Sequence, residues 1–196
     1  MYPVSFEMDF VERRSRLTTF LRLILAIPHL IFASVYGLVF YVVWIVAWFV
    51  LLFTGRWPQS LYNFTCGFLR YVSRLSAYLY LGVDQYPPFN GADNDSYPVR
   101  VQIAPALERY SRVKVLFLVL YALVAYVIRY AMGIVLSFVS LVSWVVIVIT
   151  GRQPEALQDA LNFSLAYTVR ADALMFMLVQ TYPPFGSGQQ VTVAHS

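Results

Sequence analysis

The chain has 196 residues, of which 60% are hydrophobic, 17% aromatic and only 12% charged. Soluble globular domains carry about 25% charged residues, so this composition excludes an ordinary soluble protein and predicts a membrane protein. The net charge of +4 comes from arginines beside apolar segments instead of a basic run. Such arginines suit anionic lipid headgroups and argue against nucleic-acid binding.

An internal repeat divides the chain into two similar halves. Residues 54–58 (TGRWP) return at 150–154 (TGRQP), and residues 86–89 (YPPF) return at 182–185, both at an offset of 96. Several matches in register are not expected by chance. The predicted organisation is a first membrane repeat over 1–90, a linker over 91–96, a second membrane repeat over 97–186 and a C-terminal tail over 187–196.

Each repeat is predicted to open with a short strand. Residues 4–10 alternate apolar and polar side chains, and residues 99–103 repeat the alternation. A period of two is typical of a half-buried strand, so the two segments are candidates for pairing with each other. Gln189 to Ala194 is a candidate for a third short strand.

The first long apolar segment, Leu23 to Phe53, holds 31 residues without a formal charge. One straight helix of that length exceeds a hydrocarbon core of about 30 Å, which favours a helical hairpin. Gly37 and Gly133 occupy equivalent positions and mark the predicted turns, with Arg129 near the second apex. The expected spans are 17–35, 38–54, 113–129 and 132–150.

A corner of the form Gly-Arg-x-Pro follows each apolar segment. Gly55 and Gly151 suit left-handed helix C-caps, and Arg56 and Arg152 follow them. Each arginine is a candidate phosphate or partner contact, or else a charge that closes a spanning helix by reaching the interface. The charge rule predicts one shared cytoplasmic side, in the inner membrane and with both termini cytoplasmic, for Arg13, Arg14, Arg16, Arg56, Arg109, Arg112, Lys114 and Arg152.

An amphipathic helix is predicted after each corner. In residues 59–83, apolar side chains recur every three or four positions, while Arg70 and Arg74 lie on another face. Arginines at mid-bilayer are costly, so this helix is expected along the cytoplasmic membrane surface. The second copy, 155–180, keeps Arg170 but has Ala166 where the first has Arg70.

Aromatic residues at the ends of these segments are predicted interfacial anchors. The two prolines of each Tyr-Pro-Pro-Phe segment stop a helix and hold the chain extended, with an aromatic ring on each side. A ligand-binding aromatic clamp is the alternative. The predicted anchors are Trp57, Tyr86, Phe89, Tyr182 and Phe185.

Candidates for catalytic chemistry are few. His29 follows Pro28 within the first apolar segment, and Cys66 is the single cysteine. His29 has no companion ligands in the sequence and is interpreted as a packing residue. No phosphate loop or nucleophile motif is present. We therefore expect no catalytic residues, no cofactor, no metal site and no enzymatic activity.

The pattern as a whole resembles the bacterial membrane family catalogued as domain of unknown function 4389. The resemblance rests on Arg16 to Arg22, Pro28-His29, Trp48, residues 53–58 (FTGRWP), Arg70, Arg74, Tyr78 and residues 84–89 (DQYPPF). It covers residues 2–89 and, in weaker form, 97–185. The resemblance implies a multi-spanning membrane protein of unassigned activity.

The predicted fold class is an all-α integral membrane protein built of two parallel repeats. Each repeat is expected to consist of a short strand, a transmembrane hairpin and an amphipathic interfacial helix. Two functions are compatible with this fold. The favoured one is a non-catalytic accessory or scaffold subunit that contacts other membrane-protein subunits. The alternative is binding or transfer of phospholipid, with an enzyme acting on lipid a distant third. The candidate contacts for a lipid headgroup or partner are Arg56, Arg70, Arg74, Arg152 and Arg170.

Overall fold

The computed structural model describes residues 2–185 and is mostly helical. The predicted tail strand at Gln189 to Ala194 lies outside the described residues. In chain order the elements are β1 (Val4–Met8), α1 (Arg16–Thr54), α2 (Gln59–Leu79), β2 (Val99–Ile103), α3 (Arg112–Leu116), α4 (Leu118–Thr150) and α5 (Glu155–Met175).

The ends of the long helices follow from their capping residues. Ser15 precedes α1, and its hydroxyl accepts a hydrogen bond from the Thr18 N–H. Gly55 caps the C-terminus of α1 and Gly151 that of α4, with φ angles of 68° and 72°. Only glycine adopts this left-handed conformation without a steric penalty, so both predicted C-caps are confirmed.

The predicted helical hairpins are wrong. α1 is one continuous helix of 39 residues, and α4 is one of 33 residues. Gly37 and Gly133 lie inside them, and a Cβ added at either would meet no atom within 4 Å. A glycine inside a helix costs only about 1 kcal/mol, too little to break it without further turn residues. In place of four spans, the described chain has two helices long and apolar enough to cross a membrane.

The predicted pairing of the two opening strands is confirmed. β1 and β2 are antiparallel, with Phe6 opposite Val101. These two residues are equivalent positions of the repeat at an offset of 95, and the flanking pairs, Val4 with Ile103 and Met8 with Val99, exchange under the same offset. The two repeats are therefore related by an approximate two-fold axis through the Phe6–Val101 pair.

Each repeat also closes the corner of the other. The Arg14 N–H donates to the Gly151 carbonyl at 3.0 Å, and the Tyr110 N–H donates to the Gly55 carbonyl at 2.8 Å. We call the start of α1 with the end of α4 the first end of the molecule, and the end of α1 with α3 the second end. Each end thus combines parts of both repeats.

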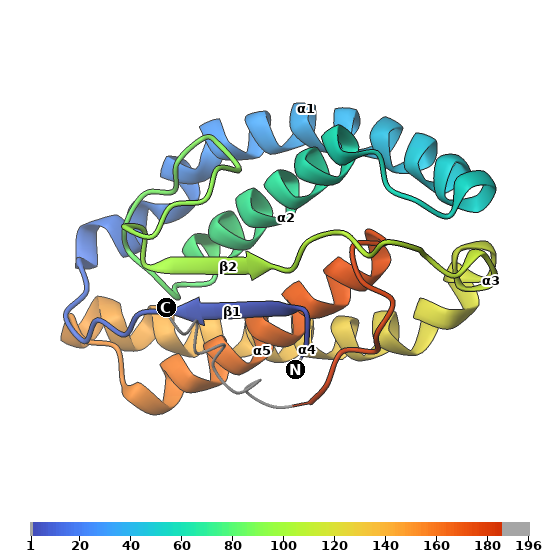
Figure 1. Cartoon of the computed structure of the whole chain (residues 1–196). Coiled ribbons are helices and arrows are strands. Elements are labelled where there is room, and N and C mark those ends of the chain that lie inside the picture. The colour runs from blue at the N-terminus through green and yellow to red at the C-terminus, as the bar shows by residue number, and fades with distance from the viewer. Residues whose placement is uncertain (1, 186–196) are drawn as a thin grey trace, which may run out of the picture.

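The helices pack in pairs around the strands. In the view of Figure 1, α1 and α2 lie above the strand pair and α4 and α5 below it, and α1 also contacts α4. α2 contacts α1, β2 and α5, while α5 contacts α4 and β1. The prediction that the apolar side of α2 lies in lipid is wrong, because that side packs inside the protein. Phe68 of α2 stacks on Phe40 of α1, with ring centroids 4.1 Å apart, and also meets Phe176.

The expected grouping of arginines also needs correction. A helix of 39 residues is about 58 Å long, so Arg13 and Arg56 lie at opposite ends of α1. Arg13 instead forms a backbone bridge with Arg152 of the second repeat at the first end. The continuous helix explains the error, because a hairpin would have returned the chain to its starting side.

Gly37 and Gly133 offer a test of the continuous helices, with Gly55 as a matched control. Gly37→Ala and Gly133→Ala should each raise the free energy of unfolding in detergent by about 0.5–1 kcal/mol, because alanine restricts the unfolded chain and meets no neighbour. Gly55→Ala should lower it by about 1–2 kcal/mol because its φ is positive. A loss above 1 kcal/mol at Gly37 would indicate a turn and contradict the helix.

Candidate functional site

A basic cleft lies at the second end of the molecule. It has a volume of about 670 Å³ and is open to solvent. Arg56 comes from the corner after α1, while Arg109 and Arg112 come from the segment that begins the second repeat. All three arginines are exposed. The remaining lining residues are Thr54, Gly55, Tyr110 and Val113.

Local hydrogen bonds fix the shape of this cleft. The Thr54 hydroxyl accepts a hydrogen bond from the Arg56 N–H at 3.1 Å, and Tyr110 N–H bonds to the Gly55 carbonyl. The Arg112 Nε atom lies 3.6 Å from the place that a Cβ on Gly55 would occupy. Segments far apart in sequence, at Arg56 and at Arg109 to Arg112, thus place their guanidinium groups around one corner.

The charge of the cleft is not compensated by neighbouring carboxylates. Within residues 2–185, no acidic side chain lies within 4 Å of the guanidinium nitrogens of Arg56, Arg109 or Arg112. Guanidinium groups bind phosphate and carboxylate oxygens through paired hydrogen bonds. The arrangement therefore suits a phosphate-bearing or other anionic ligand.

The equivalent corner at the first end is different. Arg152 pairs with Glu12 there, with an N–O distance of 3.5 Å. Arg14 is buried and donates to the Gly82 carbonyl at 2.8 Å and to the Gln158 side chain at 3.3 Å. Burial lowers the pKa of Arg14, while the nearby Asp84 carboxylate raises it. At the first end, the charge of Arg152 is thus partly compensated, and Arg14 packs inside the protein.

The five arginines predicted from the sequence are not brought together. Arg56 and Arg152 are exposed at opposite ends. Arg70 is partly buried and contacts the Val101 carbonyl and Asp93. Two others are buried: Arg74 donates to the Ala92 carbonyl at 2.8 Å, and only 3% of Arg170 is exposed. Neither buried arginine reaches the protein surface, so neither enters the lipid contacts proposed below.

The predicted aromatic anchors also separate into two groups. Trp57 is buried, and its indole N–H donates to the Met177 carbonyl of the other repeat at 3.0 Å. It therefore joins the two repeats and is not placed at a surface. The other four rings, Tyr86, Phe89, Tyr182 and Phe185, are exposed.

His29 lies in a cluster of aromatic rings. It is fully buried, stacks on Phe89 with ring centroids 3.9 Å apart, and has Nδ1 3.1 Å from the Tyr71 hydroxyl. No group of three or more His, Cys, Asp or Glu side chains with metal-binding geometry occurs in the described residues. His29 therefore contacts aromatic side chains from α2 and from the segment after it.

Sequence reasoning missed an ion pair between the buried Arg22 and the partly exposed Asp84. The Arg22 guanidinium donates to Asp84 and to the carbonyls of Tyr78 and Val83. Asp84 also accepts a hydrogen bond from the Ser15 N–H at 2.9 Å, which ties the start of α1 to the segment after α2. The sequence signal was a lone arginine near the start of an apolar helix, which needs a partner when it is buried.

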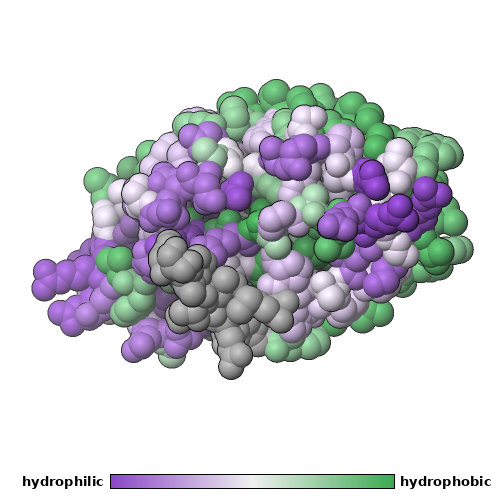
Figure 2. All heavy atoms as spheres, in the orientation of Figure 1, coloured by the Kyte–Doolittle hydropathy of each residue, from purple (hydrophilic) through white to green (hydrophobic). Residues whose placement is uncertain are grey.

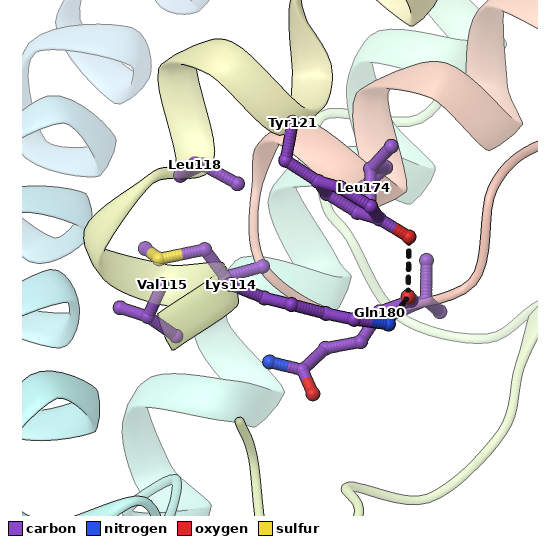
Figure 3. Close-up of a pocket in the computed structure, with 8 residues that line it drawn as sticks. Lys114, Val115, Leu118, Tyr121, Leu174 and Gln180 are labelled. Carbon is purple, nitrogen blue, oxygen red and sulfur yellow. Dashed lines mark hydrogen bonds between the residues drawn. The ribbon is translucent and has the colours of Figure 1, made fainter. Parts of the chain in front are cut away.

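The second repeat replaces this ion pair with neutral residues. Leu118 stands at the position of Arg22, and Gln180 at that of Asp84. The Gln180 side chain keeps the equivalent bond, because its Oε1 accepts from the Ser111 N–H at 2.8 Å. Figure 3 shows Lys114 and Tyr121 converging on the Gln180 carbonyl. Both members of the Arg22–Asp84 pair are thus replaced by neutral residues in the second repeat.

A second ion pair occurs only in the second repeat. Arg129 of α4 pairs with Asp172 of α5 and not with a headgroup at a hairpin apex, as the sequence had suggested. The pair borders a cavity of about 360 Å³ between α2 and α5, which Ser73, Ser76 and Thr168 also line. Burial raises the pKa of Asp172, while Arg129 lowers it.

Comparison with models of protein families gives a match to each of the two repeats. The family model described as "Domain of unknown function (DUF4389)" matches residues 16–90 and again residues 112–187. The chain belongs to this family. Its two tandem copies correspond to the two repeats predicted from the sequence. No curated protein and no solved structure shows a significant match to the chain.

The DUF4389 chain contains its own control for the Arg22–Asp84 pair. Asp84→Gln leaves a buried arginine without its counter-charge and should lower the free energy of unfolding by about 3 kcal/mol. Adding Arg22→Leu reproduces the residues of the second repeat and should restore at least half of that loss. Gln180→Ala, which removes a neutral hydrogen bond, should cost only about 1 kcal/mol.

Denaturant unfolding in detergent measures all three variants. Equal stability of the Asp84→Gln single variant and the double variant would show that an unpaired Arg22 carries no penalty, contrary to this account.

Proposed function

We propose that this DUF4389 chain is a non-catalytic membrane protein that serves as an accessory or scaffold subunit of a larger membrane assembly. The observation that carries the proposal is the outward surface of α1 and α4. The most apolar 18-residue window of each helix is only 17% buried within the molecule. A core helix of a soluble protein would be mostly buried, so these faces need lipid or partner helices to cover them.

The outward face of α1 is apolar along the whole helix. Exposed side chains recur every three or four residues from Leu17 to Phe53. Arg22 is the single charged residue in that range, and it is buried inside the molecule. The outward face of α4 is built in the same way, with exposed residues that include Leu120, Leu123, Val127, Tyr130, Ile134, Phe138, Leu141, Val145 and Ile149.

Aromatic side chains on these faces favour a scaffold role. Tyr41, Phe49, Tyr126, Tyr130 and Phe138 are all exposed. Flat, rigid rings supply large contact areas at a small entropic cost, and they are enriched where proteins meet. Four of the five lie in the central or C-terminal parts of their helices, where a partner helix could pack against them.

Phospholipid binding is the second candidate function, and the basic cleft at the second end favours it. Three exposed arginines, which have no carboxylate partner within residues 2–185, surround one corner next to the apolar end of α1. A phospholipid joins an anionic headgroup to apolar chains, which matches that combination. The same features suit an acidic segment of a partner subunit.

Purification of the full chain from native membranes in a mild detergent tests the proposal. A scaffold subunit should co-purify with other membrane proteins in a fixed ratio. A single monodisperse protein that carries phospholipid in a fixed ratio would contradict the scaffold role and support the second candidate.

Matched arginine variants then locate the contact. Arg56→Gln with Arg109→Gln should remove at least half of the bound anionic lipid or partner, measured by mass spectrometry of the purified complex. Arg13→Gln with Arg152→Gln changes the equivalent corner, where Glu12 already compensates the charge, and should remove much less. Equal losses would contradict a specific role for the cleft.

A further inference from the structure

We propose that the molecule lies within one leaflet, with α1 and α4 along the membrane plane, and does not cross the bilayer. This inference rests on the proposed membrane residence and adds how the protein is oriented there. The occupant of its outward apolar faces is then the acyl-chain region of an anionic leaflet. Three independent observations support the arrangement.

The first observation is the length of the apolar face. From Leu17 to Phe53, α1 rises about 54 Å at about 1.5 Å per residue. A bilayer core of about 30 Å could contain this face only if the helix were tilted by about 56°, whereas spanning helices are tilted by roughly 0–40°. A helix along the membrane plane keeps its whole apolar face in lipid without any such mismatch.

The second observation is the distribution of basic residues under the approximate two-fold axis. The first end carries Arg13, Arg16 and Arg152, and the second end carries Arg56, Arg109, Arg112 and Lys114. In an upright molecule these ends would lie on opposite sides of the membrane, and both sides would be basic. Cytoplasmic loops normally hold most of the positive charge, and a flat orientation places both ends at the same surface.

The third observation is the charged strand pair halfway between the two ends. Arg100 of β2 pairs with Asp9 at 2.7 Å and with Glu7 at 3.6 Å. The side chains of Glu7 and Asp9 are 42% and 48% exposed. In an upright molecule these charges would face acyl chains at mid-bilayer, where exposed charged groups are rare because they lose their contact with water. In a flat molecule they face water.

The surface view agrees with this orientation. In Figure 2 the face that carries the strand pair is largely hydrophilic, and hydrophobic residues form much of its rim. A helix is about 10–12 Å in diameter, which fits within half of a hydrocarbon core of about 30 Å. One layer formed by α1 and α4 can therefore occupy a single leaflet, with the basic ends at the level of its anionic headgroups.

Single-cysteine labelling of the full chain tests the orientation. In a Cys66→Ser background, Glu12→Cys reports the first end, Gln59→Cys the second end and Glu7→Cys the strand pair. All three positions are exposed or partly exposed. A membrane-impermeant maleimide is applied to intact cells and to inverted membrane vesicles, and detergent-dissolved protein gives the full labelling of each variant.

The flat orientation predicts that all three cysteines are labelled from the cytoplasmic side alone. Labelling of Glu12→Cys and Gln59→Cys from opposite sides, or protection of Glu7→Cys in both preparations, would overturn it. Extraction of the protein by alkaline carbonate would contradict the membrane residence itself. Failure of the flat orientation and failure of the membrane residence therefore give different results.

Discussion

The exchange of backbone hydrogen bonds between the two repeats determines the rest of the structure. β1 pairs with β2 across the approximate two-fold axis, and each repeat closes the helix corner of the other through Arg14 with Gly151 and Tyr110 with Gly55. Neither repeat could satisfy its strand or its corner alone. As a result, α1 and α4 are held side by side with their apolar faces outward, and basic residues gather at both ends.

The two repeats differ at several equivalent positions. The first repeat has the Arg22–Asp84 pair and the His29 aromatic cluster, whereas the second has Arg129 with Asp172. The two corners differ as well, because Glu12 compensates Arg152 while the cleft around Arg56 has no carboxylate within 4 Å in the described residues. We expect any specific ligand or partner contact to follow differences of this kind between the two repeats.

The sequence predicted the repeat, the strand pair and both glycine caps, because each depends on a local pattern or on matches at a fixed offset. It did not predict the long helices. The hairpin was inferred from the assumption that an apolar segment must cross the bilayer, whereas α1 and α4 are continuous helices. Arg74 and Trp57 were placed at a surface because their partners, the Ala92 carbonyl and the Met177 carbonyl, are backbone groups that no sequence pattern reveals.

The depth of α1 in a lipid bilayer tests the central claim most directly. Spin labels at Leu23, Leu38 and Phe53, all on the exposed face of α1, can be measured in vesicles that contain anionic phospholipid by their relative collision rates with oxygen and with a nickel chelate. The account predicts the same depth for all three labels, within one leaflet. A label at Leu38 near the bilayer centre, with the other two near opposite surfaces, would contradict it.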